Sequence, residues 1–123
     1  MYKIGEFSKI VNIPVRTLRY YDEYGLLCPT KIDDFTGYRY YSEENILECE
    51  LIKMLKSVNF SLEEIVEYKD SITNEILEKK KEQILQEITE LEKKYIRLEK
   101  MQEKIKNNNI GTKILKKESE KNE

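Results

Sequence analysis

Apolar residues follow a helical period at the start of the chain. Ile4, Phe7 and Val11 recur at i, i+3 and i+7, and this spacing predicts a short helix over residues 4–11 with one apolar face. Asn12 follows that pattern, and asparagine tolerates the left-handed backbone that a tight turn needs. The first element should therefore be a short helix that ends in a tight turn.

A second helical pattern follows the turn. Pro14 suits the opening of a helix, because its missing N–H group has no partner there in any case, and Gly25 suits the end. Val15 and Leu18 should point inward. The residues that lie three or four apart on the opposite face are Arg16, Arg19, Tyr20 and Glu23. Two short helices joined by a tight turn, the second with a polar exposed face, predict a helix-turn-helix.

The period changes to two over residues 26–41. Residues 33–37 form a turn-rich stretch, and residues 38–41 return as a strand rich in tyrosine. Alternation puts Tyr38 and Tyr40 on one face, with Arg39 and Tyr41 on the other. This segment predicts a small hairpin, or wing.

Two more helices should follow the wing. Ser42 can cap the first, whose expected apolar stripe consists of Leu47, Leu51, Ile52, Leu55 and Val58. Asn59 is a plausible stop, and Ser61 opens a capping box that starts another helix at about residue 62. Residues 56–61 between these helices predict a second, smaller wing.

The last predicted element is a long helix over residues 74–106, which contain no glycine or proline. Its heptad seam consists of Leu77, Ile84, Ile88, Leu91, Tyr95, Leu98 and Ile105. Lys81 and Gln102 interrupt the seam. A single helix of about 50 Å cannot bury such a stripe, so the pattern predicts a partner, and a homodimer is the simplest one. The tail after this helix is polar, charged and expected to be disordered.

Charge alone gives little sign of nucleic-acid binding. The net charge is −2, and residues 1–41 carry six Lys and Arg against five Asp and Glu, a balance of +1. If the protein binds DNA, the fold must sort the cations onto one face.

Composition also excludes several classes of protein. No run of about 18 apolar residues exists, and the N-terminus has no signal-peptide core, so we expect a cytoplasmic protein with no membrane partner. The chain has no histidine, and its two cysteines cannot complete a closed metal site. No nucleophile is paired with a base, so an enzyme is not expected.

Two tyrosine- and arginine-rich segments carry the candidate chemistry. Residues 17–22 read Thr-Leu-Arg-Tyr-Tyr-Asp, and residues 36–42 read Thr-Gly-Tyr-Arg-Tyr-Tyr-Ser. Arginine offers a forked cation for phosphates and guanine edges, and tyrosine offers a stiff ring with a hydroxyl that reaches phosphate or sugar. A helix and a hairpin that carry this pair are typical of a recognition helix and a wing that bind duplex DNA.

The ordered motifs resemble the MerR family of bacterial transcription regulators. The resemblance lies in residues 4–8, 16–22, 25–27 and 33–42. Within the family, the chain is most similar to the DNA-binding half of the multidrug-sensing branch, without a C-terminal effector domain. It covers residues 1–70 by sequence and residues 71–107 by architecture. The expected domains are a DNA-binding domain over 1–70, a dimerisation helix over 71–107 and a tail over 108–123.

The resemblance implies a fold and a mode of action. The fold would be mainly α with a small β-hairpin, a winged helix-turn-helix dimerised through an antiparallel coiled coil. The homodimer would bind and distort a pseudo-palindromic site in double-stranded promoter DNA, and so act on RNA polymerase indirectly. The implied DNA-binding residues are Arg16, Thr17, Arg19, Tyr20 and Tyr21 on the recognition helix, Tyr38, Arg39 and Tyr41 on the wing, and Lys56 and Ser61 on the second wing.

Departures from the family pattern narrow the sensing chemistry. Metal and iron–sulfur sensors place cysteines after the long helix, where this chain has none, and Met54 stands where thiol-stress sensors carry a cysteine. We therefore expect no metal and no cofactor, and the sequence identifies no small-molecule effector. Cys28 and Cys49 are expected to be inert.

The tyrosines should divide between the surface and the core. At least one ring of Tyr20 and Tyr21 should face outward, and one ring of the three tyrosines in the wing should pack inward.

Two alternative functions stay open at this stage. The protein could also be an architectural DNA-binding factor, or a partner without an effector domain that forms heterodimers with a full-length regulator. The long helix favours the homodimeric regulator.

Overall fold

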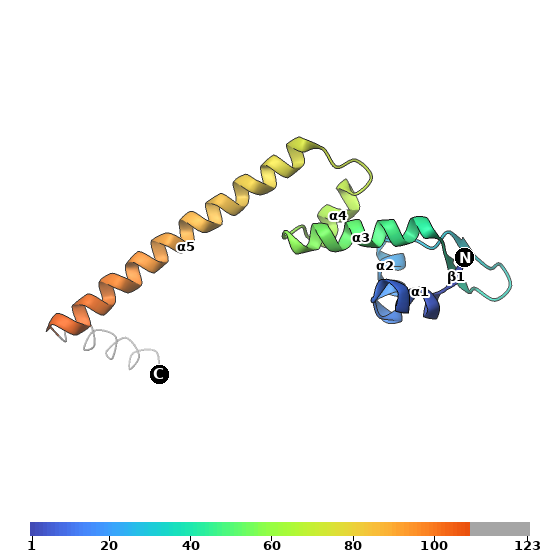
Figure 1. Ribbon diagram of the computed structural model, residues 1–123, viewed down its shortest axis with the longest axis horizontal. Coiled ribbons are helices and arrows are strands. Elements are labelled where there is room, and N and C mark those ends of the chain that lie inside the picture. Colours follow the sequence, from blue (N-terminus) through green and yellow to red (C-terminus); the bar gives the residue numbers. More distant parts are fainter. Residues whose placement is uncertain (109–123) are drawn as a thin grey trace. The chain divides into compact units, whose positions relative to one another are not determined.

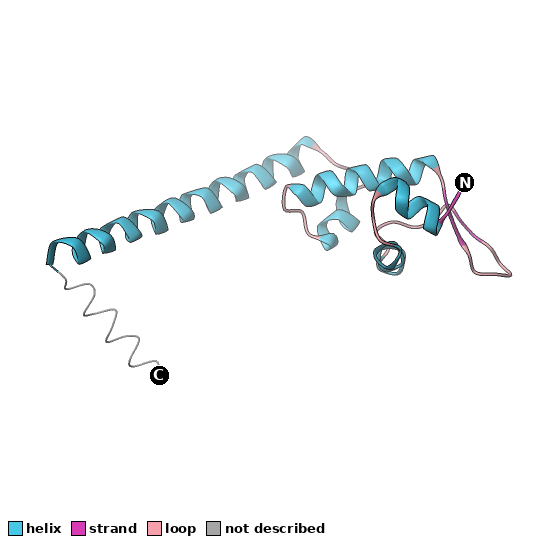
Figure 2. Ribbon diagram, turned by 60° about the horizontal axis from the view of Figure 1, so that its bottom comes forward, coloured by secondary structure: helices cyan, strands magenta, loops and turns pink. Residues whose placement is uncertain are grey.

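The computed structural model describes residues 1–108, which fall into one compact unit, Met1–Ile72, and a second that begins at Thr73. The elements are β1 (Tyr2–Lys3), α1 (Ile4–Val11), α2 (Val15–Tyr24), β2 (Lys31–Ile32), β3 (Arg39–Tyr41), α3 (Glu43–Ser57), α4 (Leu62–Tyr68) and α5 (Asn74–Asn108), shown in Figures 1 and 2. The mainly helical fold with a small sheet confirms the predicted class.

Local signals fix the helix-turn-helix. Asn12 adopts the left-handed conformation at φ 56° and ends α1. Pro14 is extended and precedes α2, and Gly25, at φ 83°, ends α2 and donates its N–H to carbonyls of the last turn. The predicted helix-turn-helix is confirmed, and α2 begins at Val15, one residue after Pro14.

The wing belongs to a three-stranded antiparallel sheet with strand order β1-β3-β2. The central strand β3 pairs Tyr41 with Tyr2 and Tyr40 with Lys31. The hairpin was predicted, but β1 was not, since two residues carry no periodic signal. The extra strand matters because it ties the N-terminus of α1 to the wing.

The buried face of α3 differs from the predicted one. Leu47 is 65% exposed and Val58 is also exposed, whereas Asn45 and Cys49 are buried beside Ile52 and Leu55. Asn45 is buried because its amide is fully used: Oδ1 accepts from the Ser42 N–H at 2.9 Å, and Nδ2 donates to the Cys28 carbonyl at 3.0 Å. The prediction followed the leucines and overlooked a polar residue that fastens the wing to α3.

The core of the first unit lies between the helix-turn-helix, the sheet, α3 and α4. Phe7 stacks on Tyr41 with ring centroids 4.3 Å apart, and Leu18, Leu26 and Leu27 are fully buried. Ser61 caps α4 in the predicted capping box, accepting from the Glu64 N–H at 3.1 Å while Glu64 accepts from the Ser61 N–H at 2.9 Å.

The helix α5 forms the described part of the second unit. It runs without a break, and most of its heptad seam is exposed, including Leu91 at 64%. None of the helices in residues 1–108 has the length and apolar character needed to cross a bilayer. The predicted disordered tail lies outside the described residues, apart from Asn108.

Candidate nucleic-acid interface

The outer face of α2 gathers the candidate residues of the recognition helix. Arg16, Arg19 and Tyr20 are exposed, and Thr17 is half-buried beside them. With Glu23 they line one hollow of about 510 Å³. Tyr20 also stacks on Tyr24 with ring centroids 5.7 Å apart, which limits its motion. The face therefore offers two guanidinium groups around an ordered aromatic ring.

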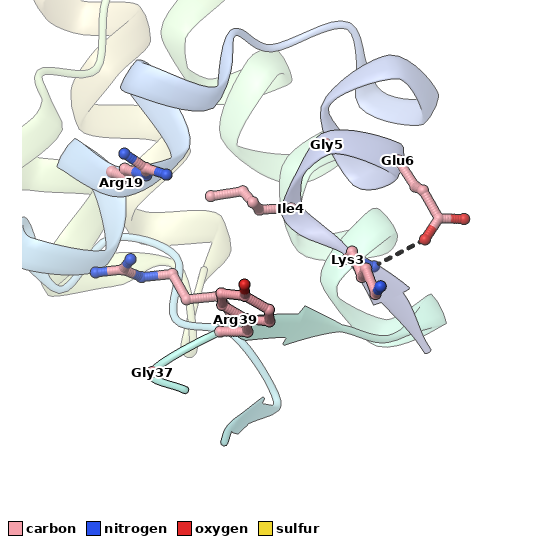
Figure 3. Close-up of a pocket in the computed structure, with 8 residues that line it drawn as sticks. Lys3, Ile4, Gly5, Glu6, Arg19, Gly37 and Arg39 are labelled. Carbon is pink, nitrogen blue, oxygen red and sulfur yellow. Dashed lines mark hydrogen bonds between the residues drawn. The ribbon is translucent and has the colours of Figure 1, made fainter. Parts of the chain in front are cut away.

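A second hollow of about 400 Å³ joins α2 to the wing. Its lining residues are Lys3, Ile4, Gly5, Glu6, Arg19, Gly37, Tyr38 and Arg39. Arg19 and Arg39 lie on one side of it, with Lys3 across from them (Figure 3). Since Arg19 lines both hollows, the two surfaces form one continuous face.

Sequence reasoning missed the contribution of the N-terminus to this face. The pairing of β1 with β3 brings Lys3 to the hollow. Glu6 accepts from the Lys3 backbone N–H at 3.3 Å and so closes the first turn of α1. Only non-local strand pairing places Lys3 here, and its position in the sequence gives no hint of it.

Arg39 connects the wing to the recognition helix. Its Nε donates to Oδ2 of Asp22 at 2.7 Å, and this hydrogen bond raises the pKa of Arg39. Both side chains are partly buried. A guanidinium has five N–H donors, so one contact through Nε leaves donors for a phosphate. The wing arginine thus has two possible tasks, to hold the helix and to bind DNA.

Two of the predicted contact tyrosines are buried. Tyr41 is 0% exposed beneath Phe7, and burial raises its pKa to about 12. Tyr21 is 5% exposed and its hydroxyl accepts from Nζ of Lys56 at 3.2 Å. Direct DNA contact by these two residues stays a prediction, and both rings lie below the surface of the single chain. As expected, Tyr20 faces outward and one ring of the wing, Tyr41, packs inward.

The segment predicted as a second wing consists of the last turn of α3 and a short turn that leads to α4. Lys56, in the last turn of α3, is exposed, and its Nζ lies 5.8 Å from the centre of the Tyr21 ring, so this end of α3 is close to α2. Ser61 is exposed as well, but its Oγ already caps α4. Of the two residues, Lys56 has the more available polar group.

The two cysteines have raised thiol pKa values. Burial raises the pKa of Cys49 to about 11, and partial burial together with Asp22 raises the pKa of Cys28. Within residues 1–108, no three side chains of His, Cys, Asp or Glu come together as a metal site. Neither thiol has the thiolate character that reactive cysteines need.

Comparison with known proteins places this architecture. The family model of the MerR HTH family regulatory protein matches residues 2–72. The chain belongs to the MerR family. The multidrug-efflux transporter 1 regulator of Bacillus subtilis is 42% identical over 69 residues, which cover 56% of this chain and 25% of that protein. The regulator AdhR of Bacillus subtilis is 38% identical over 65 residues, 53% of this chain and 46% of that one.

Solved structures agree with this assignment. The EcmrR–DNA complex is 30% identical with a TM-score of 0.75 and covers 89% of this MerR chain and 41% of that one. The N-terminal part of the Bacillus subtilis multidrug transporter activator is 26% identical with a TM-score of 0.72, and the match covers 81% of this chain and 96% of that one. This chain spans less than half the length of the two curated relatives named above, both of which are regulators.

Proposed function

We propose that this protein is a sequence-specific regulator of transcription that binds a pseudo-palindromic promoter site as a homodimer and distorts it. The observation that carries the proposal is the continuous face formed by the two hollows, which meet at Arg19. On it, Arg16 and Tyr20 project from α2, and Tyr38 and Arg39 come from the wing.

The face is suited to duplex DNA because it sorts the charges that the sequence only balances. The linings of the two hollows hold four cations, Lys3, Arg16, Arg19 and Arg39, against two carboxylates, Glu6 and Glu23. The helix α2 is short enough to lie in the major groove, where arginine reads guanine, while the wing reaches the flanking backbone. Lys56 extends the same binding role to the last turn of α3.

A second copy of the chain is the proposed partner of α5. The exposed seam residues form an apolar stripe of a size that folded proteins seldom leave open to water. An antiparallel coiled coil would cover it and hold two recognition helices at a fixed spacing. A two-fold symmetric protein binds a pseudo-palindrome for this geometric reason.

The same proposal sets the place of action. A promoter-binding protein works where the bacterial chromosome lies, in the cytoplasm, and meets RNA polymerase through the DNA that both bind. The EcmrR structure is a complex of that regulator with DNA in an open promoter assembly. Distortion of the promoter is the step by which a protein with so small a surface could change transcription.

Selection from a random duplex library tests this function. The unmodified protein should retain duplexes with a two-fold symmetric motif. Arg16→Ala or Arg19→Ala should weaken binding by about 1–3 kcal/mol and relax the preference at one base if the lost contact is to a base edge. Lys100→Ala, which removes an exposed cation of α5, is the matched control and should bind normally. Recovery of no motif would rule the proposal out.

A further inference from the structure

The tip of the wing carries an aromatic ring that is almost fully open to solvent. Phe35 is 99% exposed, more than any other large apolar side chain in residues 1–108. A phenyl ring held in water gives no stability to the fold. The ring therefore calls for a role outside the folded domain.

The turn that holds Phe35 is well ordered. Oδ1 of Asp33 accepts from the backbone N–H groups of Phe35 and Thr36 at 2.8 and 2.9 Å, and these bonds lower the pKa of Asp33. Gly37, at φ 72°, donates to the Asp33 carbonyl at 2.9 Å, and the Asp33 N–H donates to the Tyr38 carbonyl at 2.9 Å. Because the backbone is fixed in this way, binding need not first order it.

The tip is continuous with the proposed DNA-binding face. The same hairpin carries exposed Ile32 and Tyr38, and Tyr38 lines the hollow with Arg19 and Arg39. The loop between β2 and β3 extends away from the helices in both ribbon views (Figures 1 and 2). A hairpin beside a helix in the major groove lies over the flanking phosphates, and the groove beyond these phosphates is the minor groove.

We propose that Phe35 is an apolar wedge that enters this minor groove and partly unstacks one base step in each half-site. The proposal rests on the proposed function, and it assigns part of the promoter distortion to one side chain. Apolar wedges of this kind unstack a base step and kink the duplex. The carboxylate of Asp34, next to the ring, is repelled by the phosphates that flank either groove, so it should lower the affinity for every duplex.

A fluorescence experiment tests the wedge. The duplex recovered by selection carries 2-aminopurine, which brightens when it unstacks, at one adenine position at a time. The unmodified dimer should brighten a pair of positions placed symmetrically about the centre. Phe35→Ala should abolish this signal and weaken binding by about tenfold, the order expected for one lost stacking contact. Phe35→Leu, which keeps an apolar wedge, should retain most of the signal.

Controls separate the wedge from charge and from folding. Asp34→Asn removes a negative charge one residue away and should tighten binding to all duplexes without changing the 2-aminopurine pattern. Phe35→Ala should unfold at the same denaturant concentration as the unmodified protein, because the ring is almost fully open to solvent. A retained duplex whose 2-aminopurine pattern is unchanged by Phe35→Ala would overturn the wedge while leaving the proposed function intact. If Phe35→Ala kept the 2-aminopurine pattern but lost transcription by added RNA polymerase, the ring would instead contact a protein partner.

Discussion

At the scale of single residues, the candidate face depends on which polar groups the fold has already used. Arg39 donates to Asp22, Ser61 caps α4, and Tyr21 accepts from Lys56. Within residues 1–108, Arg16 and Arg19 form no side-chain hydrogen bond or ion pair, and both stay exposed on α2. Substitution of the residues whose donors are not used within the fold should therefore reduce the DNA affinity of the protein most.

The two tasks of Arg39 can be separated. Arg39→Ala should weaken binding to all sequences by a similar factor and reduce the slope of log affinity against log salt by about one unit, as expected for one lost phosphate contact. Asp22→Asn keeps the cation and removes its partner's charge, so it should leave the salt slope unchanged. Equal slopes for Arg39→Ala and the unmodified protein would show that Arg39 only holds the wing in place.

The burial of Tyr41 makes a second prediction. Its hydroxyl is buried and forms no hydrogen bond within residues 1–108. Tyr41→Phe should therefore leave the free energy of unfolding unchanged or raise it by about 1 kcal/mol, and should not alter DNA affinity. Tyr41→Ala should cost about 3–5 kcal/mol, because it leaves a cavity beside Phe7. Denaturant unfolding measures the free energy of unfolding of both variants. A loss of DNA affinity in folded Tyr41→Phe would indicate a direct contact between the Tyr41 hydroxyl and DNA.

Cys49 should make stability depend on alkaline pH. Its thiol is 1% exposed, and burial raises its pKa from 9.0 in the unfolded chain to about 11. The folded state thus favours the neutral thiol, and this contribution is complete below pH 9 and is lost as the pH rises toward 11. Linkage puts the full loss at roughly 3 kcal/mol, because each pH unit between the two pKa values contributes about 1.4 kcal/mol. Cys49→Ala should flatten the fall in unfolding free energy over this window, and an unchanged slope would contradict the assignment.

At the scale of elements, local signals were predictable and pairing was not. Asn12, Gly25 and the Ser61 capping box each mark a boundary through the backbone of a few neighbouring residues, and the structure keeps all three. The strand β1 depends on its pairing with β3 near Tyr41, and the burial of Asn45 on α3 depends on the carbonyl of Cys28 before the wing. No local pattern contains that information.

The candidate site follows the same division. Arg16, Arg19 and Tyr20 were predictable because helical spacing alone sets the outer face of α2. In the wing, simple alternation put Arg39 and Tyr41 on one face. The sheet register and the packing of Phe7 decide that Tyr41 is buried, while Arg39 turns to Asp22. Lys3 entered the face for the same non-local reason.

At the scale of the whole molecule, the proposed function requires two copies, and α5 is the element that should join them. Its seam is exposed in the single chain, so we expect its apolar residues to contribute to association rather than to the fold of residues 1–72. Heptad packing would bury them against the same seam of a partner. The interface would be dominated by leucine, isoleucine and tyrosine.

Leu91→Lys should dissociate the dimer. Leu91 lies near the middle of the seam and is 64% exposed, so lysine at this position costs the single chain little but would place unpaired charges in the dimer interface. Gln86→Lys adds the same charge on the side of the helix opposite the seam and should stay dimeric. Sedimentation at micromolar concentration should therefore give a monomer for Leu91→Lys and a dimer for Gln86→Lys and for the unmodified protein.

The same pair of variants links assembly to DNA binding. A monomer retains the face on α2 and the wing, so Leu91→Lys should bind a single half-site as the unmodified domain does. It should lose the gain in affinity that a full palindrome gives the dimer, since its two domains are no longer joined and each must bind independently. Gln86→Lys should keep that gain. If the unmodified protein sediments as a monomer, or if Leu91→Lys binds the palindrome as tightly as Gln86→Lys, α5 does not set the spacing of the half-sites.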